Sequence, residues 1–148
     1  MTEHVEAWLE HFKNMHITIG PVFDYDGDGI KDELNKSVPA IPSHIFYIFK
    51  RCLEDPDEYA VQQCPEESLD AIAVVLPNDE ENVNCEAPPE FLSRHSARIR
   101  DIEMLTGLYF PQAQDTTENL RLRMKVPGKV WPMTPRILGQ HSTAHHSD

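Results

Sequence analysis

One short stretch of this sequence carries acidic side chains at the spacing of a metal site. Residues 24–32 read DYDGDGIKD, with aspartates at alternate positions ahead of a glycine. Calcium is a hard cation that takes roughly six to eight oxygen ligands, which alternate acids in a tight turn can supply. Gly29 gives the backbone the freedom to turn. We therefore predict a calcium site formed by the backbone carbonyl of Ile30 and by the carboxylates of Asp24, Asp26, Asp28 and Asp32.

The alternative interpretation of this stretch is a solvated acidic turn. Without a cation, the crowded aspartates would repel one another, and Lys31 is the one positive charge among them. The stretch differs from a complete EF-hand, because the last position of that pattern is Asn35 rather than a bidentate glutamate. Gly20 and Pro21 also precede it where an EF-hand has a helix. These features favour a structural calcium site over a calcium sensor.

No catalytic motif accompanies the acidic stretch in the sequence. His16, His44 and His95 stand singly beside apolar residues, where a histidine is more often packed or capping than catalytic. The sequence has no Gly-x-Ser-x-Gly elbow, Cys-x-x-Cys pair or His-Glu-x-x-His motif. A flexible tail accounts more simply than a transition-metal site for His141, His145 and His146.

The elements that must position the acidic stretch are short helices and strands. Apolar side chains at helical spacing predict a first helix over residues 5–12, and residues 15–19 alternate like a half-buried strand that ends at Gly20. The runs 45–49 and 71–76 are typical of strands buried on both faces. A further helix, continuous or broken near Arg98, is expected to begin near Pro89 and to end by Gly107. This order predicts an α+β fold rather than a regular βαβ fold.

Length and charge exclude several classes of protein. A chain of 148 residues forms one domain at most, and its formal charge of -12 argues against binding to duplex nucleic acid. Solvated faces or helix-terminal charges account for two basic clusters, Arg94, Arg98 and Arg100, and Arg121, Arg123 and Lys125. No stretch approaches the roughly 18 apolar residues of a membrane span, and the first residues lack the pattern of a signal peptide. Residues 131–148 are predicted to form a disordered tail.

Five blocks in one order resemble the C-terminal part of the ectonucleotide pyrophosphatase/phosphodiesterases, the autotaxin family. Residues 20–29 resemble its Gly-Pro-Val-Phe-Asp stretch and calcium loop, and residues 41–52 resemble its Pro-Thr-His strand that ends in Ser-Cys. Residues 73–78 are similar to its Phe-Ile-Leu-Pro-His segment, and residues 82–85 to its Asn-Glu-Ser-Cys. Residues 95–110 resemble its His-x-Ala-Arg-Val-x-Asp-Val-Glu-x-Leu-Thr-Gly-Leu-x-Phe signature.

This resemblance implies a fold and a set of bonds. The family's C-terminal domain is similar to DNA/RNA non-specific endonucleases of the ββα-metal, or His-Me finger, type. Residues 1–130 would then be the C-terminal portion of a nuclease-like domain whose N-terminal part is missing. The resemblance also implies structural calcium in the loop, a disulfide between Cys52 and Cys64, and a bond from Cys85 to a domain absent from this chain. Two reduced, buried thiols are the alternative for Cys52 and Cys64.

The resemblance further implies a non-catalytic role beside a nucleotide-hydrolysing phosphodiesterase domain. In the family, the threonine nucleophile and the zinc ions belong to that catalytic domain, which has no counterpart in this sequence. The resemblance also implies an extracellular or cell-surface location. Asn35 begins the triplet Asn-Lys-Ser and is a candidate glycan acceptor.

Two other functions stay open on the sequence alone. The chain could be part of an active, metal-dependent DNA/RNA non-specific endonuclease that completes its site with another chain. Against this, the sequence lacks the Asp-Arg-Gly-His motif that such nucleases usually carry. Separately, Asn78 departs from the histidine that the resembled family has at this place. A calcium-responsive binding module would need helices on both sides of the loop, which the pattern does not predict.

Overall fold

The computed structural model of this chain describes residues 12, 14–34, 40–54, 61–78, 88–110, 117–126 and 131. These residues contain an antiparallel sheet whose four strands lie in the order β1-β2-β3-β4. The strands are β1 (Met15–Val22), β2 (His44–Cys52), β3 (Leu69–Pro77) and β4 (Ser96–Ala97). The helices are α2 (Pro88–Arg94), α3 (Ile99–Thr106) and α4 (Thr117–Met124), with the 3-10 turns η1 (Val61–Gln63) and η2 (Glu66–Ser68). The predicted α+β class is therefore confirmed.

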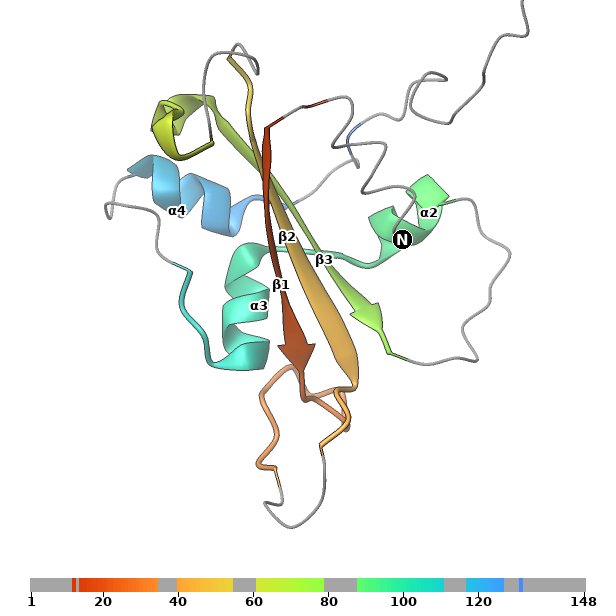
Figure 1. The fold of residues 1–148 in the computed structure, drawn as a ribbon. Coiled ribbons are helices and arrows are strands. Elements are labelled where there is room, and N and C mark those ends of the chain that lie inside the picture. Colours follow the sequence, from red (N-terminus) through yellow and green to blue (C-terminus); the bar gives the residue numbers. More distant parts are fainter. Residues whose placement is uncertain are drawn as a thin grey trace, which may run out of the picture.

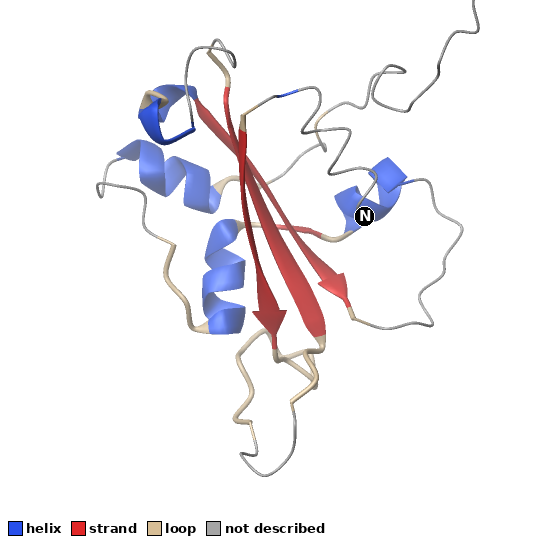
Figure 2. Ribbon diagram, in the orientation of Figure 1, coloured by secondary structure: helices blue, strands red, loops and turns tan. Residues whose placement is uncertain are grey.

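The sheet separates two apolar cores. Helices α3 and α4 lie on one side of it and α2 lies on the other (Figures 1 and 2). Phe46 and Ile48 of β2 belong to the core that contains Ile102 of α3, whereas Phe49 of the same strand belongs to the core that contains Leu92 of α2. Because β2 and β3 contribute side chains to both cores, their sequences are continuous apolar runs, as predicted.

The first predicted strand is confirmed but continues past the expected stop. Gly20 and Pro21 both lie within β1, which pairs with β2 as far as Val22 opposite His44. Pro21 is tolerated because β1 is the outer strand of the described sheet. Gly20 is required by packing, since a Cβ there would lie 2.6 Å from the ring of Phe46.

The predicted helix over residues 89–107 is two helices, with the break at the expected place. α2 ends at Arg94, and β4 then pairs with β3 before α3 begins. At the start of α3, the carboxylate of Asp101 accepts the backbone N–H of Arg98 at 3.0 Å. At its end, Gly107 adopts a left-handed conformation, with φ of 68°, which favours glycine.

Some predicted elements lie outside the described residues. Of the predicted helix over residues 5–12 only Phe12 is described, and it has a helical conformation. Cys85 and Asn35 lie outside the described residues, as do residues 132–148. Trp131, which the sequence assigned to the tail, is buried in the core that contains Leu92.

The disulfide between Cys52 and Cys64 is present. It joins the end of β2 to the residue after η1, with a Cα–Cα distance of 5.7 Å, and both cysteines are buried. In the part of the chain that the structure describes, no helix is long and apolar enough to cross a bilayer.

Candidate metal site

The acidic stretch follows β1 after one residue, Phe23, and each of its ends is held by a hydrogen bond to a residue next to a strand. At the first end, the N–H of Asp24 donates to the hydroxyl of Ser43 at 3.0 Å, just before β2. At the other end, the N–H of Asp32 donates to the carbonyl of Phe23 at 2.8 Å. Residues 24–32 therefore form a closed loop, which we call the acidic loop. The sheet determines the position of this loop.

Asp24 organises the backbone of the acidic loop. Its side chain is only 7% exposed, and its Oδ1 accepts the N–H of Gly27 at 2.9 Å and that of Asp28 at 3.2 Å. Its Oδ2 accepts the N–H of Gly29 at 3.2 Å. Gly27 and Gly29 have φ values of 72° and 84°, so both turns need the left-handed conformation that glycine adopts most readily.

Three carboxylates of the loop come together at one place. One oxygen from each of Asp24, Asp26 and Asp28 lies within 4.8 Å of the others. Asp26 and Asp28 are exposed, and each accepts the N–H two residues ahead, at 3.2 Å and 2.8 Å. Three clustered hard oxygen donors are the chemistry that calcium or magnesium needs, so the residues present fit such an ion.

Asp32 and Ile30 are arranged differently from these three aspartates. Among the described residues, the carboxylate of Asp32 is not part of the cluster, and its Oδ2 accepts the N–H of Tyr25 at 2.6 Å. This bond closes the loop across its neck. The side chain of Ile30 points into solvent, and its N–H is bound by Asp28. Of the four carboxylates in the predicted ligand set, three therefore lie together, and the predicted role of the Ile30 carbonyl stays a prediction.

The residues that hold the acidic loop in place were missed by the sequence analysis. Ser43 accepts the N–H of Asp24 and donates its own hydroxyl to the carbonyl of Val22 at 3.1 Å. Asn78, after β3, donates its side-chain amide to the carbonyl of Pro42 at 3.0 Å. The hydroxyl of Tyr25 donates to the carbonyl of Ile41. These bonds join residues far apart in sequence, so no local pattern could have indicated them.

The predicted single histidines are not brought together. His16 lies near the start of β1 opposite Lys50, whereas His44 begins β2 at the other end of the same strand pair. The ring of His44 contacts the hydroxyl of Ser43, and the ring of His95 contacts the carbonyl of Phe91. His44 and His95 thus have local structural contacts. His141, His145 and His146 lie outside the described residues.

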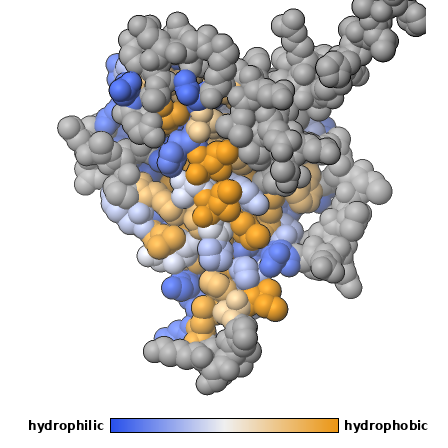
Figure 3. All heavy atoms as spheres, viewed as in Figure 1, coloured by the Kyte–Doolittle hydropathy of each residue, from blue (hydrophilic) through white to orange (hydrophobic). Residues whose placement is uncertain are grey.

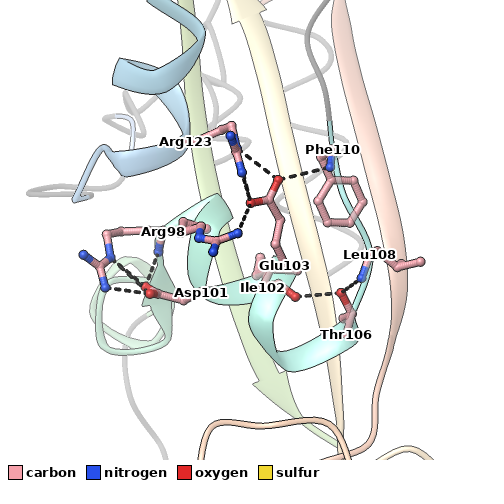
Figure 4. A network of polar contacts seen from close by, with 9 residues as sticks. Arg98, Asp101, Ile102, Glu103, Thr106, Leu108, Phe110 and Arg123 are labelled. Carbon is pink, nitrogen blue, oxygen red and sulfur yellow. Dashed lines mark hydrogen bonds and ion pairs between the residues drawn. The ribbon is translucent and has the colours of Figure 1, made fainter. Parts of the chain in front are cut away.

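A second acidic centre lies between α3, α4 and the segment after α3 (Figure 4). Glu103 is 4% exposed, and its carboxylate accepts Arg123 Nε at 3.0 Å, Arg100 Nη1 at 3.3 Å and the N–H of Phe110 at 3.1 Å. Burial alone would raise the pKa of Glu103, but these donors outweigh it and lower the pKa below its usual range. The arrangement is that of a structural ion cluster.

A third acidic centre lies on the opposite side of the sheet. Asp70 of β3 accepts the indole N–H of Trp131 at 2.8 Å, pairs with Lys125, and lies 3.5 Å from Arg51 Nη2. Burial would raise the pKa of Asp70, and its bonds to Lys125 and Trp131 more than reverse the effect, so the pKa is lowered. The guanidinium of Arg51 lies 4.3 Å from the ring centroids of both Phe12 and Trp131.

Most residues of the two basic clusters form ion pairs, and three of them belong to these centres. Arg100 and Arg123 bind Glu103, Arg98 binds Asp101, and Arg121 pairs with Glu118. Lys125 binds Asp70. These five basic residues are therefore paired with carboxylates of the same chain, and Arg123 is largely buried rather than on a solvated face.

Comparison with known proteins identifies clear relatives. No protein-family model matches the chain. It is 37% identical over 136 residues to ectonucleotide pyrophosphatase/phosphodiesterase family member 3 of Bos taurus, covering 76% of this chain and 14% of that protein. It is 32% identical over 130 residues to a venom phosphodiesterase of Naja atra, covering 76% and 15%. It is 30% identical over 144 residues to family member 1 of Homo sapiens, covering 83% and 15%. The chain thus spans a small part of the length of these relatives.

Proposed function

Because this chain belongs to the ectonucleotide pyrophosphatase/phosphodiesterase family, we propose that it is a non-catalytic, calcium-binding part of such a protein. In this proposal, the 148 residues form the C-terminal portion of a nuclease-like domain, and they support a phosphodiesterase domain that hydrolyses nucleotides. Zinc would belong to that catalytic domain alone. The parent protein would act outside the cell or at its surface, in keeping with relatives named venom phosphodiesterases and ectonucleotide pyrophosphatases.

The observation that carries the calcium assignment is the convergence of Asp24, Asp26 and Asp28 within 4.8 Å. Backbone donors already fix the carboxylate of Asp24, so a cation would enter a loop whose shape is largely set beforehand. Binding would relieve the repulsion between neighbouring carboxylates. The backbone carbonyl of Ile30 and the carboxylate of Asp32, directly or through water, would complete the oxygen ligands.

A supporting rather than catalytic role agrees with the environment of the signature between residues 95 and 110. Its two acidic residues are both ion-paired, the partly exposed Asp101 with Arg98 and the buried Glu103 with Arg123. Such ion pairs fix helices in place and leave these carboxylates no spare capacity as general bases. We propose that the parent's catalytic groups lie outside these 148 residues. The partner of this chain would be the phosphodiesterase domain itself.

Calorimetric titration and thermal unfolding of the purified chain with calcium test the metal assignment. We expect calcium to raise the unfolding free energy by about 2.7 kcal/mol at a hundredfold excess over the dissociation constant. Asp28→Ala should abolish the rise. The matched control is Glu33→Ala, which removes an exposed acid next to the loop but outside the carboxylate cluster and should keep the response. A wild-type chain that neither binds calcium nor gains stability from it would overturn the assignment.

Activity assays test the non-catalytic role separately. The calcium-loaded chain should not hydrolyse a nucleotide phosphodiester or cleave DNA above a buffer blank. Metal-dependent DNA cleavage that persists through purification and disappears in Asp24→Ala would instead favour an active endonuclease. That result would overturn the supporting role even if calcium binds as proposed.

A further inference from the structure

Ser43 is held in a fixed position at the end of the sheet where the acidic loop begins. It directly precedes β2, and its N–H donates to the carbonyl of Val22 at 2.9 Å while its carbonyl accepts the N–H of Asn78 at 2.9 Å. Val22 is the last residue of β1 and Asn78 directly follows β3, so these bonds continue the pairing of the three strands. The sheet therefore fixes the backbone from which the side chain of Ser43 projects.

The hydroxyl of Ser43 makes as many hydrogen bonds as a hydroxyl can. Such a group has one hydrogen to donate and two lone pairs that accept. It accepts the N–H of Asp24 at 3.0 Å and donates to the carbonyl of Val22 at 3.1 Å. Its third contact, at 3.0 Å, is with Nδ1 of His44. Because the hydroxyl hydrogen is already donated to Val22, Nδ1 must carry the hydrogen of this third contact. The neutral ring of His44 is therefore the Nδ1–H tautomer.

We propose that Ser43 is a positioning residue of the calcium site, with its hydroxyl oriented by the Nδ1–H of His44. This inference rests on the calcium site proposed above. Asp24 is the buried member of the carboxylate cluster, and its carboxylate accepts three backbone N–H groups of the acidic loop. The bond from its own N–H to Ser43 fixes where the backbone of Asp24 leaves the sheet, and thereby the point from which this carboxylate reaches the cluster.

Holding Asp24 in place should raise the affinity of the acidic loop for calcium. Neighbouring carboxylates repel one another, so a loop without such a bond can separate them before an ion arrives. The bond to Ser43 opposes this separation, and a site that is already assembled loses less free energy on binding. The acidic loop projects beyond the end of β1 (Figure 1), and hydrophilic residues are exposed at this end of the molecule (Figure 3). An ion can therefore reach Asp26 and Asp28, which are both exposed.

Calorimetric titration of the full chain with calcium tests the role of Ser43. Ser43→Ala should raise the dissociation constant by roughly tenfold, as is usual when a group that orients a metal ligand is lost. Ser43→Thr keeps the hydroxyl and should bind like the wild type. The matched control is Ser96→Ala, which removes a hydroxyl that donates to the carbonyl of Ser93 at 2.8 Å and should also bind like the wild type. A merely structural role of Ser43 would lower the stability of the calcium-free chain in Ser43→Ala and leave the dissociation constant unchanged.

NMR of the imidazole nitrogens in the isotope-labelled wild-type chain provides a readout that needs no variant to bind calcium. At a pH where the ring is neutral, we expect the hydrogen of His44 on Nδ1 and none on Nε2, with the signals assigned by their absence in His44→Gln. A hydrogen on Nε2 would overturn the role of His44, because Ser43 would then have to donate to Nδ1.

The outcomes separate this inference from the calcium site on which it rests. A wild-type chain that binds calcium no more tightly than Ser43→Ala would overturn the role of Ser43 alone. A wild-type chain that does not bind calcium would overturn the proposed calcium site and this inference together. Weaker binding by Ser43→Thr or Ser96→Ala, equal to that of Ser43→Ala, would also overturn the inference, since the loss would not follow the hydroxyl at position 43.

Discussion

Glu103 shows how one buried carboxylate can connect three segments. It lies in α3, binds Arg123 of α4, and accepts the backbone N–H of Phe110 from the segment after α3. Removing the charge of Glu103 leaves the largely buried Arg123 without its counter-charge, and this is costlier than losing an exposed pair. At the residue scale, this site therefore gives the sharpest expectation for stability.

Glu103→Gln should lower the unfolding free energy by about 1.5 to 3 kcal/mol near pH 7, the range for a hydrogen bond to a charged group. The pKa of Glu103 is lowered in the folded state, so its contribution is fully present above the unfolded pKa of about 4.3 and is lost as pH falls through the lower folded value. The difference between variant and wild type should therefore shrink on acidification. Urea unfolding at a series of pH values measures it.

The control for this experiment is Glu118→Gln in α4. Glu118 pairs with Arg121 at the surface, where an ion pair contributes at most about 1 kcal/mol. A difference for Glu103→Gln that stays constant down to the lowest pH would contradict the ionic account. It would point instead to a change in packing.

At the scale of elements, the disulfide ties the end of β2 to Cys64, which lies a few residues before β3. Cys52 and Cys64 are separated by 12 positions. Because their bond restricts the conformations of the unfolded chain, it raises the unfolding free energy by about 3 kcal/mol in the chain-entropy model. The double variant Cys52→Ala/Cys64→Ala should lose a similar amount of unfolding free energy, measured in urea. A reducing agent should lower the stability of the wild type towards that of the variant.

The same reducing agent should leave the double variant unchanged, which separates the disulfide from any effect on Cys85. Equal stability of the wild type with and without reductant would contradict the prediction. So would a double variant that remains sensitive to the reductant.

The central strands could be predicted from the sequence because their signal is local. β2 and β3 contribute to both cores, and this dictates apolar side chains at consecutive positions. α4 could not be predicted, because its sequence TENLRLRM has no apolar stripe. Leu122 is its buried apolar residue, and Arg123 connects it to Glu103 through an ion pair. A helix held by long-range charge pairing leaves no periodic pattern to detect.

The candidate metal site, too, could be predicted from the sequence only in part. Alternation of acids around Gly27 and Gly29 is local, and it predicted the three carboxylates that cluster. Asp32 instead accepts the N–H of Tyr25, a bond that depends on how the loop closes. The spacing of the acids therefore could not show whether Asp32 binds a metal ion or closes the loop. The support from Ser43 comes from the next strand and required the fold to be seen.

At the scale of the whole molecule, one cluster joins the two ends of the described chain. The guanidinium of Arg51 in β2 packs on the rings of Phe12 and Trp131, and these two rings, from opposite ends of the described chain, contact each other edge to face at 5.4 Å. The indole N–H of Trp131 also donates to Asp70 of β3. The region after α4 is therefore fastened to the centre of the sheet at this residue.

Trp131→Ala should lower the unfolding free energy by about 3 to 5 kcal/mol, the usual range for removing a buried aromatic side chain. Trp131→Phe keeps an aromatic ring beside Arg51 but loses the donor to Asp70, so its effect should be intermediate. Leu120→Ala, at an exposed position of α4, is the control and should change stability by less than about 0.5 kcal/mol. Urea unfolding followed by circular dichroism reports all three, and no loss in Trp131→Ala would contradict the prediction.

The contact between Gly20 and Phe46 restricts which residues can occupy position 20. The ring of Phe46 is fully buried and is backed by Phe110, so it has no room to move away from a new side chain at position 20. In a library of random variants selected only for folding, position 20 should stay glycine while the neighbouring exposed Ile19 varies. An unchanging glycine at this position in related proteins would therefore record steric exclusion by an aromatic ring, and it would carry no information about catalysis.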